Sequence, residues 1–561
     1  MKLFTANNAK NSNIIKFATI GVVLLFASTL IILNDPVQMI VDSQLAMRTG
    51  SLLYSFWIKP PLEVLLKVYI FNITNLEEFK LGIDKKLKLQ EIGPYVYQEF
   101  LENVNASFHD NNTLSYLPKR HVKFIPEYSV GDPEVDRIVA PNIPYMGVTS
   151  AISSISGFAA FGLRVLTKQF NAKSILDISV NEYLWGYDDP MVNMASKIVP
   201  SFINFERFGL LDRMFDEGDN LITIRLPDKK KSNSNEIKEE FRDYSIESWN
   251  GKKGIGIWGF SDTNNKSNTA CNTLNGAYDG TLFPRNISAG ETFRVYRKAF
   301  CKTLPITYSH PGKFNGIDVL NFKLPDNAFE TNINDPDTAC FCQENKCLKR
   351  GLGNITPCYY NIPLALSFPH FFNADPSLLD EIEGLYPIEA KHGTEIAIQP
   401  QLGIPMRVHS RFQVNLLMGD IKFNSDMTRF RNTVLPIFWL DIGIETLPPH
   451  IIFLLQLLFK IAPYAQLGAI ILFTTAGVSL VGTSLLLYIW LPTAWNSLNV
   501  TMEHTLSVEA AKMTNVCLMP LLKQSKDIKG QLCKQQMGSK PEYELIMLPL
   551  EKELDAEDFM V

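Results

Sequence analysis

The stretch LGAIILFTTAGVSLVGTSLLLYIWL, residues Leu467 to Leu491, decides the structural class of this chain. It holds 25 residues without a charged side chain and ends with Tyr488 and Trp490 close together, which suit the interface between lipid and water. About 20 apolar residues in a helix span the hydrocarbon core of a bilayer, whereas a buried helix of a soluble protein is rarely apolar on every face over this length. The stretch therefore predicts a transmembrane helix.

A second apolar run, FATIGVVLLFASTLIIL from Phe17 to Leu33, lies near the other end of the chain. Its length corresponds to roughly 25 Å of helix, just enough to cross a bilayer. A cleaved signal peptide is the alternative, but no clear small-x-small cleavage site follows the run before Asn34, Asp35 and Pro36. We predict an uncleaved membrane anchor.

The charges beside the first span predict the orientation of the chain. Lys2, Lys10 and Lys16 precede this span, and positively charged flanks stay in the cytoplasm. The second span tests the orientation poorly, because Lys460 precedes it and no Lys or Arg follows until Lys512. The prediction divides the chain into a cytoplasmic N-terminus (1–16), a transmembrane helix (17–33), a glycosylated ectodomain (34–466), a second transmembrane helix (467–491) and a cytoplasmic tail (492–561).

Six of the eight cysteines fall within the predicted exterior, in one part of the chain. An even number of cysteines in an oxidising compartment predicts disulfide bonds. A zinc site is the alternative, but no paired C-x-x-C halves or spaced histidines accompany the cysteines, so we expect no metal. Six cysteines allow 15 pairings, and their spacing leaves the pairing open, although a bridge within Cys340-Phe-Cys342 would be strained. The six are Cys271, Cys301, Cys340, Cys342, Cys347 and Cys358.

N-glycosylation sequons are no more numerous than the composition gives by chance, so we predict glycosylation from the side of the membrane on which each sequon lies. One of them, Asn499, falls on the predicted cytoplasmic side and should stay bare. The other six fall in the predicted exterior and are expected to carry glycans: Asn72, Asn105, Asn111, Asn265, Asn286 and Asn354.

Short apolar runs separated by Gly, Asn and Pro turns predict a largely β ectodomain. Between about Met146 and Leu211 the apolar residues instead recur at helical intervals, which predicts a helical insert in the β body. The strand-like runs are Val64–Ile73, Val96–Phe100, Leu221–Leu226, Phe293–Phe300 and Phe412–Leu417.

Sequence motifs of enzymes give no support for catalysis. Residues Gly254 to Gly259 match G-x-G-x-x-G, but a loop-like SDTNNKSNTAC follows where a dinucleotide site needs a helix. No G-x-S-x-G elbow, H-E-x-x-H helix or Walker loop occurs, so we predict no enzyme and no cofactor. The net charge of -5 lacks the basic footprint of a nucleic-acid-binding protein.

Longer motifs, in collinear order over roughly residues 15 to 490, resemble the class B scavenger receptors. This family includes fatty acid translocase, the high-density-lipoprotein receptor, the lysosomal integral membrane protein and the insect sensory neuron membrane proteins. The motifs are EIGPYVY (91–97), LWGYDDP (184–190), INDPDTACFC (333–342), LSFPHFFNADP (366–376), LGIPMRVHSRFQVNLL (402–417) and LPIFWL (435–440).

The resemblance implies a mixed, mainly β fold: an antiparallel β-barrel ectodomain with a hydrophobic tunnel toward the bilayer and an apical helical bundle. It also implies disulfides between Cys271 and Cys340, Cys301 and Cys358, and Cys342 and Cys347.

Family members use basic residues at the apex to attract ligand, and the matching region here carries Arg164, Lys168 and Lys173. A merely solvated helix face is the alternative for these cations. Their apolar neighbours are expected to form mostly bundle core: Phe158, Phe161, Leu163, Val165, Leu166 and Phe170.

The predicted function is that of a scavenger-type receptor at the plasma membrane, with both termini cytoplasmic. It would bind lipid or lipoprotein at the apex and pass lipid through the tunnel to the membrane; the alternative is a trafficking or adhesion receptor that binds a protein there. In the tail, Tyr543-Glu-Leu-Ile546 fits the Y-x-x-Φ pattern read by clathrin adaptor proteins, which would add an endosomal or lysosomal location.

Overall fold

The computed structural model describes residues 2–201, 203–215, 218, 220–227, 242–343 and 346–517. The chain forms two compact units, of which Ala27–Leu472 is the larger. The smaller combines Met1–Phe26 with Phe473–Val561, of which residues 2–26 and 473–517 are described.

A 15-stranded sheet forms the body of the larger unit and curls into a nearly closed barrel. Its main path runs β10-β11-β12-β13-β17-β18-β19-β1-β2-β3-β8-β9, and neighbours along it are antiparallel except β10 and β11. The mainly β, antiparallel barrel is thus confirmed. The strands of this path are β1 (Val64–Ile73), β2 (Leu87–His109), β3 (Thr113–Phe124), β8 (Ile222–Arg225), β9 (Ile246–Trp249), β10 (Ala277–Tyr278), β11 (Thr292–Arg297), β12 (Lys302–Phe314), β13 (Ile317–Lys323), β17 (Glu395–Gln399), β18 (Ile404–Leu417) and β19 (Val434–Ile444).

Shorter strands complete the sheets. Off the main path, β14 (Gly353–Asn354) pairs with β15 (Leu364–Ser367), β15 pairs with β18, and β16 (Ile382–Glu383) pairs with β2. Two separate two-stranded sheets join β4 (Arg137–Pro141) to β5 (Ile175–Ser179) and β6 (Tyr187–Asp188) to β7 (Arg207–Phe208).

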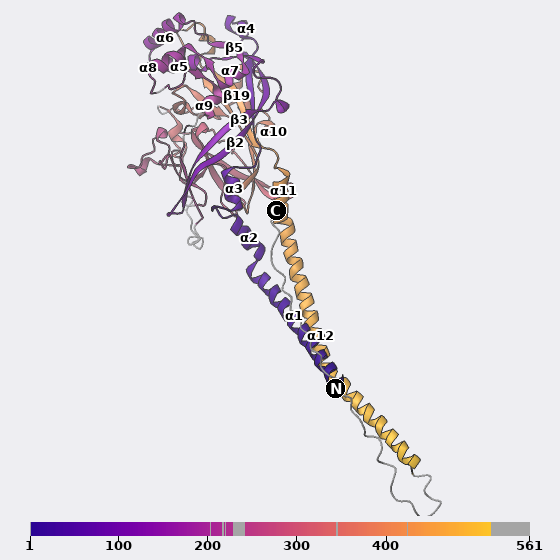
Figure 1. Cartoon of the computed structure of the whole chain (residues 1–561). Coiled ribbons are helices and arrows are strands. Elements are labelled where there is room, and N and C mark those ends of the chain that lie inside the picture. The colour runs from indigo at the N-terminus through magenta and orange to yellow at the C-terminus, as the bar shows by residue number, and fades with distance from the viewer. Residues whose placement is uncertain are drawn as a thin grey trace, which may run out of the picture. The chain divides into compact units, whose positions relative to one another are not determined.

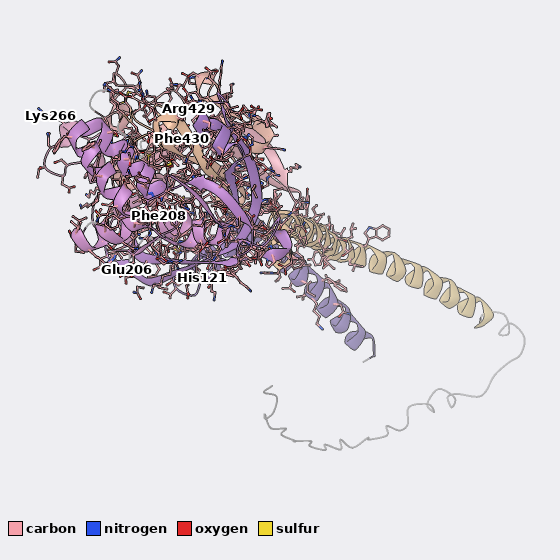
Figure 2. All side chains as sticks on the ribbon, turned by 90° about the horizontal axis from the view of Figure 1, so that it is seen from above. His121, Glu206, Phe208, Lys266, Arg429 and Phe430 are labelled. Carbon is pink, nitrogen blue, oxygen red and sulfur yellow. A yellow bond between two sulfur atoms is a disulfide. The ribbon has the colours of Figure 1, made fainter. Side chains whose placement is uncertain are left out.

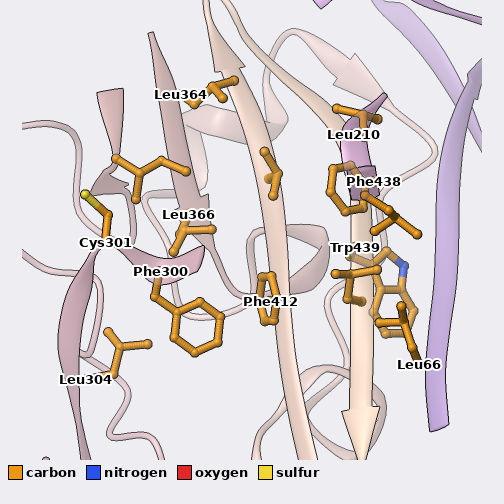
Figure 3. Packing of buried hydrophobic residues seen from close by; sticks show 14 of the residues in the cluster. Leu66, Leu210, Phe300, Cys301, Leu304, Leu364, Leu366, Phe412, Phe438 and Trp439 are labelled. Carbon is orange, nitrogen blue, oxygen red and sulfur yellow. The ribbon is translucent and has the colours of Figure 1, made fainter. Parts of the chain in front are cut away.

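The pairing of β18 with β19 places alternate apolar side chains on one face of the sheet. Ser410 lies opposite Ile442, Phe412 opposite Leu440, and Val414 opposite Phe438. Because successive side chains of a strand point to opposite faces, these three pairs share one face. Phe412 and Phe438 are buried there with other large apolar side chains (Figure 3).

The helical insert occurs where the periodicity predicts it, between β4 and β8. Side chains cap its main helices: Asn142 accepts a hydrogen bond from Tyr145 N, Ser156 from Ala159 N, and Asp189 from Met191 N and Val192 N. In Figure 1, α5, α6 and α8 lie at the end of this unit opposite α2 and α11, and we call their end the apex. The helices of the insert are α5 (Ile143–Ile155), α6 (Gly157–Gln169), α7 (Val180–Trp185), α8 (Pro190–Ile198) and α9 (Leu210–Phe215).

The remaining helices lie near the chain ends or between strands: α1 (Lys2–Asn34), α2 (Pro36–Gln44), α3 (Leu52–Ile58), α4 (Leu76–Leu81), α10 (Glu389–His392), α11 (Pro449–Gln456) and α12 (Ala462–Cys517), with a π-helical turn at Leu457–Ile461. Two segments of the described chain, Asn13–Asn34 and Pro449–Trp490, are long and apolar enough to cross a membrane. Within the smaller unit, a Cβ atom on Gly21 would lie 3.0 Å from the Gly477 carbonyl oxygen. Glycine at these positions therefore lets α1 and α12 approach closely.

Gly443 of β19 tests the β18–β19 contact. A Cβ atom at this position would overlap the carbonyl oxygen of Val408 on β18, so Gly443→Ala should force the strands apart and lower the free energy of unfolding by about 1–3 kcal/mol. We expect a lower melting temperature in differential scanning fluorimetry of the detergent-solubilised protein. Gly256→Ala is the control, because a Cβ atom there meets nothing within 4 Å. Equal melting temperatures for the two variants would contradict this account of the contact.

Candidate functional site

An apolar cavity of about 760 Å³ lies in the barrel, at the end that faces α2 and α11. Its walls come from β11, β17, β18 and β19, closed by α2, α3 and α11. This volume falls in the range of pockets that bind small molecules. Typical lining residues are Val41, Leu402, Val408, Ile442, Ile444 and Leu455.

One side of the cavity has a polar rim. Lys59, Glu102 and His121 line the cavity and are also exposed, so the cavity reaches the surface there, where Figure 2 labels His121. The His121 ring stacks on Phe100 with 4.8 Å between ring centroids. The rim thus combines an aromatic surface with groups that can bind a polar head.

A second opening lies along α2, the helix that follows the first candidate span. Ile40 lines the cavity although its side chain is 64% exposed. Polar contacts hold α2 at both ends: Arg285 Nη2 lies 2.6 Å from Asp42 Oδ1, and Gln466 Oε1 accepts a hydrogen bond from Val37 N at 3.3 Å. The cavity therefore reaches the surface close to the candidate membrane spans.

The apical cations differ in their surroundings. Lys168 on α6 and Lys173 after it are exposed. Arg164 is half-buried, and its Nη2 donates a hydrogen bond to Ser425 Oγ at 3.1 Å. The structure thus leaves two of the three predicted cations fully available at the surface and ties Arg164 to the loop between β18 and β19.

The expectation that the apolar side chains of α6 form bundle core is wrong for most of them. Phe158 is 88% exposed, and Phe161, Val165 and Phe170 are exposed as well. Only Ala160 and Thr167 of this helix are fully buried, because α6 packs through its small side chains. Residues 158, 161 and 165 have helical spacing and form one exposed apolar stripe, which we call the α6 stripe.

A sequence profile of the CD36 family matches residues 19–488. The chain belongs to the CD36 family. It is 30% identical over 452 residues to scavenger receptor class B member 1 of Bos taurus, covering 79% of this chain and 84% of that protein. It is also 30% identical over 429 residues to lysosome membrane protein 2 of Homo sapiens, covering 75% and 84%. The resemblance is confirmed, and these relatives together with the two candidate spans support a class B scavenger receptor role in a membrane.

In this CD36-family chain the six cysteines between residues 271 and 358 form three pairs: Cys271 with Cys340, Cys301 with Cys358, and Cys342 with Cys347. These are the pairs that the resemblance implies. Cys301 and Cys358 bring the start of β12 to the segment before β15, two parts of the chain that are 57 residues apart.

A cluster of titratable groups around two buried histidines is the strongest alternative to the cavity as a site. His370 Nε2 lies 2.5 Å from Glu91 Oε2, and the His370 ring stacks on His392 with 4.3 Å between centroids. The Nδ1 atoms of both imidazoles accept main-chain hydrogen bonds, from Tyr386 N and Ile388 N, and burial lowers the pKa of His392 to about 4. The two rings thus hold the 386–388 segment in place through these hydrogen bonds. No group of three His, Cys, Asp or Glu side chains in the described part of the chain is arranged to bind a metal.

The sequons differ in accessibility. Asn105, Asn111 and Asn286 are exposed, whereas Asn72 is half-buried. Asn354 is only 3% exposed, and its Nδ2 donates to the carbonyl oxygen of Phe341 at 3.3 Å, which argues against a glycan there.

Other predicted positions fall wholly or partly outside the described residues. The structure gives only the backbone of Asn265 and Asn499, so their side chains are not described. The tail residues Tyr543 and Ile546 lie entirely outside the described range.

Burial predicts the pattern of glycosylation. Because the glycan is attached through the amide nitrogen, Asn105, Asn111 and Asn286 should be modified while Asn354 stays bare. Peptide mapping after deglycosylation in heavy-oxygen water would mark each modified asparagine. The variant Thr356→Ala removes the sequon at Asn354 and should leave the glycan mass unchanged, whereas Ser288→Ala should remove one glycan from Asn286. A glycan found on Asn354 would refute the buried placement.

Proposed function

We propose that this receptor binds lipid in the barrel cavity and passes it to the bilayer through the opening along α2. The single observation that carries the proposal is the apolar cavity of about 760 Å³ that reaches the surface near the membrane spans. Exposing an acyl chain to water costs about 0.8 kcal/mol per CH₂, so a dry path avoids a large penalty during transfer. The cavity supplies such a path between barrel and bilayer.

The rim of the cavity supports an amphipathic ligand. The apolar walls suit a hydrocarbon body, while Lys59, Glu102 and His121 can bind a polar head at the surface. Inside, Glu99 is paired with Arg120 at 3.0 Å, so its charge is compensated by protein. A fatty acid or another single-headed lipid fits this distribution of groups.

The apex supports capture of lipid-covered particles. The α6 stripe can insert into a phospholipid surface, and Lys168 and Lys173 can bind anionic head groups beside it. A protein ligand for trafficking or adhesion is the second candidate, because an exposed apolar surface also suits a protein partner. The two candidates differ in whether protein-free vesicles bind.

We further propose that residues 34–466 face the exterior and that both termini are cytoplasmic. Lys2, Lys10 and Lys16 before the first span support this orientation. The plasma membrane is the proposed site of capture. In the tail, Tyr543 and Ile546 would bind clathrin adaptor proteins and direct the receptor to endosomes and lysosomes.

The substitution Ser410→Trp tests the cavity as the lipid site. Ser410 lines the cavity, so an indole there should lower the amount of tritiated oleate bound by the full-length protein about tenfold, since overpacking costs about 1–3 kcal/mol. Ser309→Trp places the same side chain at an exposed position of β12 and should bind oleate normally. Equal binding by the two variants would show that lipid does not occupy the cavity.

Charge reversal of Lys168 and Lys173 tests apical capture. Vesicles of phosphatidylcholine and phosphatidylserine should bind the Lys168→Glu/Lys173→Glu protein at least about tenfold more weakly, since each lysine contributes about 1 kcal/mol near an anionic surface. The difference should shrink in high salt, which screens exposed charges. Lys313→Glu, at an exposed position of β12, is the control. Unchanged binding at low salt would leave these lysines as a solvated helix face, and absence of vesicle binding by the unaltered protein would favour the protein ligand.

A further inference from the structure

A second, small void of about 30 Å³ lies in the larger unit, separate from the large cavity. The large cavity reaches Ser410 and Ile442 on the inner face of β18 and β19, and the small void is lined by Val414 and Phe438 on the same face. Four residues of strand correspond to about 13 Å, so the two spaces are separated by a short distance along one row of side chains.

The small void lies on the apical side of the large cavity. Its wall includes Phe208 of β7, with Leu210 and Met214 of α9, which belong to the helical insert. Leu364 of β15 completes it from the barrel. The void therefore lies where the barrel meets the apical helices, in line with the cavity that opens toward the bilayer.

Two phenylalanines close the space between the cavity and the void. The Phe300 ring packs edge-on against Phe412 with 4.7 Å between centroids. Phe300 lines the large cavity, and Phe412, paired with Leu440, occupies the row between the two spaces. Figure 3 shows the two rings next to each other, with Leu366 beside them in the direction of Leu364.

The backbone that carries Phe300 is fixed to the wall of the small void. Cys301 is bonded to Cys358, and the Tyr359 hydroxyl donates to the carbonyl oxygen of Ala299 at 2.8 Å. Tyr359 itself lines the void. Because the main chain is held on both sides of Phe300, the ring can leave its place only by rotation of its own side chain.

We propose that Phe300 and Phe412 form a gate in a single lipid path that runs from the apical helices to the membrane-side cavity. The proposal rests on the lipid-transfer function proposed above. Rotation of one ring frees a space as wide as one acyl chain, so the gate passes unbranched chains and holds back fused-ring lipids such as sterols. Phe300 is then a specificity-determining residue for lipid transfer.

Removal of either ring should open the path. The full-length protein in phosphatidylcholine proteoliposomes would receive tritiated oleate or tritiated cholesterol from donor vesicles of phosphatidylcholine and phosphatidylserine. An open state that is a minor species in the native protein becomes the major one, so Phe300→Ala and Phe412→Ala should speed oleate transfer about tenfold and speed cholesterol transfer by a larger factor. Phe300→Leu, which removes the ring with less loss of volume, should act in the same direction and serves if the alanine variants fold poorly.

Phe322→Ala is the matched control. Phe322 is a fully buried phenylalanine of β13 whose ring packs against Phe293, in a different part of the barrel from the gate. Its substitution costs similar stability, so acceleration by this variant as well would assign the effect to general loosening and overturn the gate.

A measurement of oleate binding distinguishes failure of the gate from failure of the proposed function. The gate would be overturned if the Phe300→Ala and Phe300→Leu proteins bind oleate as the native protein does but transfer lipid at the native rate. The lipid site would then still stand. A native protein that binds no oleate and transfers neither lipid would overturn both.

Discussion

The pairing of β18 with β19 is the constraint on which the inner face of the barrel depends. It brings Ser410, Phe412 and Val414 into one row opposite Ile442, Leu440 and Phe438. A slip of one residue would turn every one of these side chains to the other face and remove both the cavity wall and the aromatic closure. Gly443 allows the two backbones their close approach at the membrane-side end of this pairing.

Different helices lie at the two ends of this row of side chains. The apical helices α5, α6 and α8 lie at one end of the barrel, while α2 and α11 lie at the other and border the cavity. Polar contacts at Val37 and Asp42 hold the two ends of α2. Between these residues, apolar side chains of α2 line the cavity. The proposed capture of lipid at one end and its delivery at the other would use this asymmetry, with a charged and apolar surface outside and a largely apolar wall within.

Much of the fold could be predicted from the sequence because its signals are local. The uncharged run Leu467–Leu491 and the change of periodicity near Met146 depend only on neighbouring residues. The barrel was implied by the family resemblance of the collinear motifs. The resemblance implied a tunnel, but the residues that line the cavity could not be predicted, because its walls meet only after distant strands pair. The exposure of Phe158 could not be predicted either, since apolar spacing at 3.6 residues identifies a face but says nothing of what covers it. Asn354 shows the same limit, because a sequon carries no information on burial.

Burial of the His392 imidazole makes the stability of the fold depend on pH. In the folded chain burial lowers the pKa of His392 to about 4, whereas in the unfolded chain this histidine has its ordinary pKa of 6.5. Between these values acidification therefore favours unfolding, so the free energy of unfolding falls as the pH falls from about 6.5 toward 4. Because His392 Nδ1 accepts a hydrogen bond from Ile388 N, the segment around Ile388 is the part of the chain next to this group. Along the proposed route from the plasma membrane to endosomes and lysosomes, this one side chain would make the fold progressively less stable.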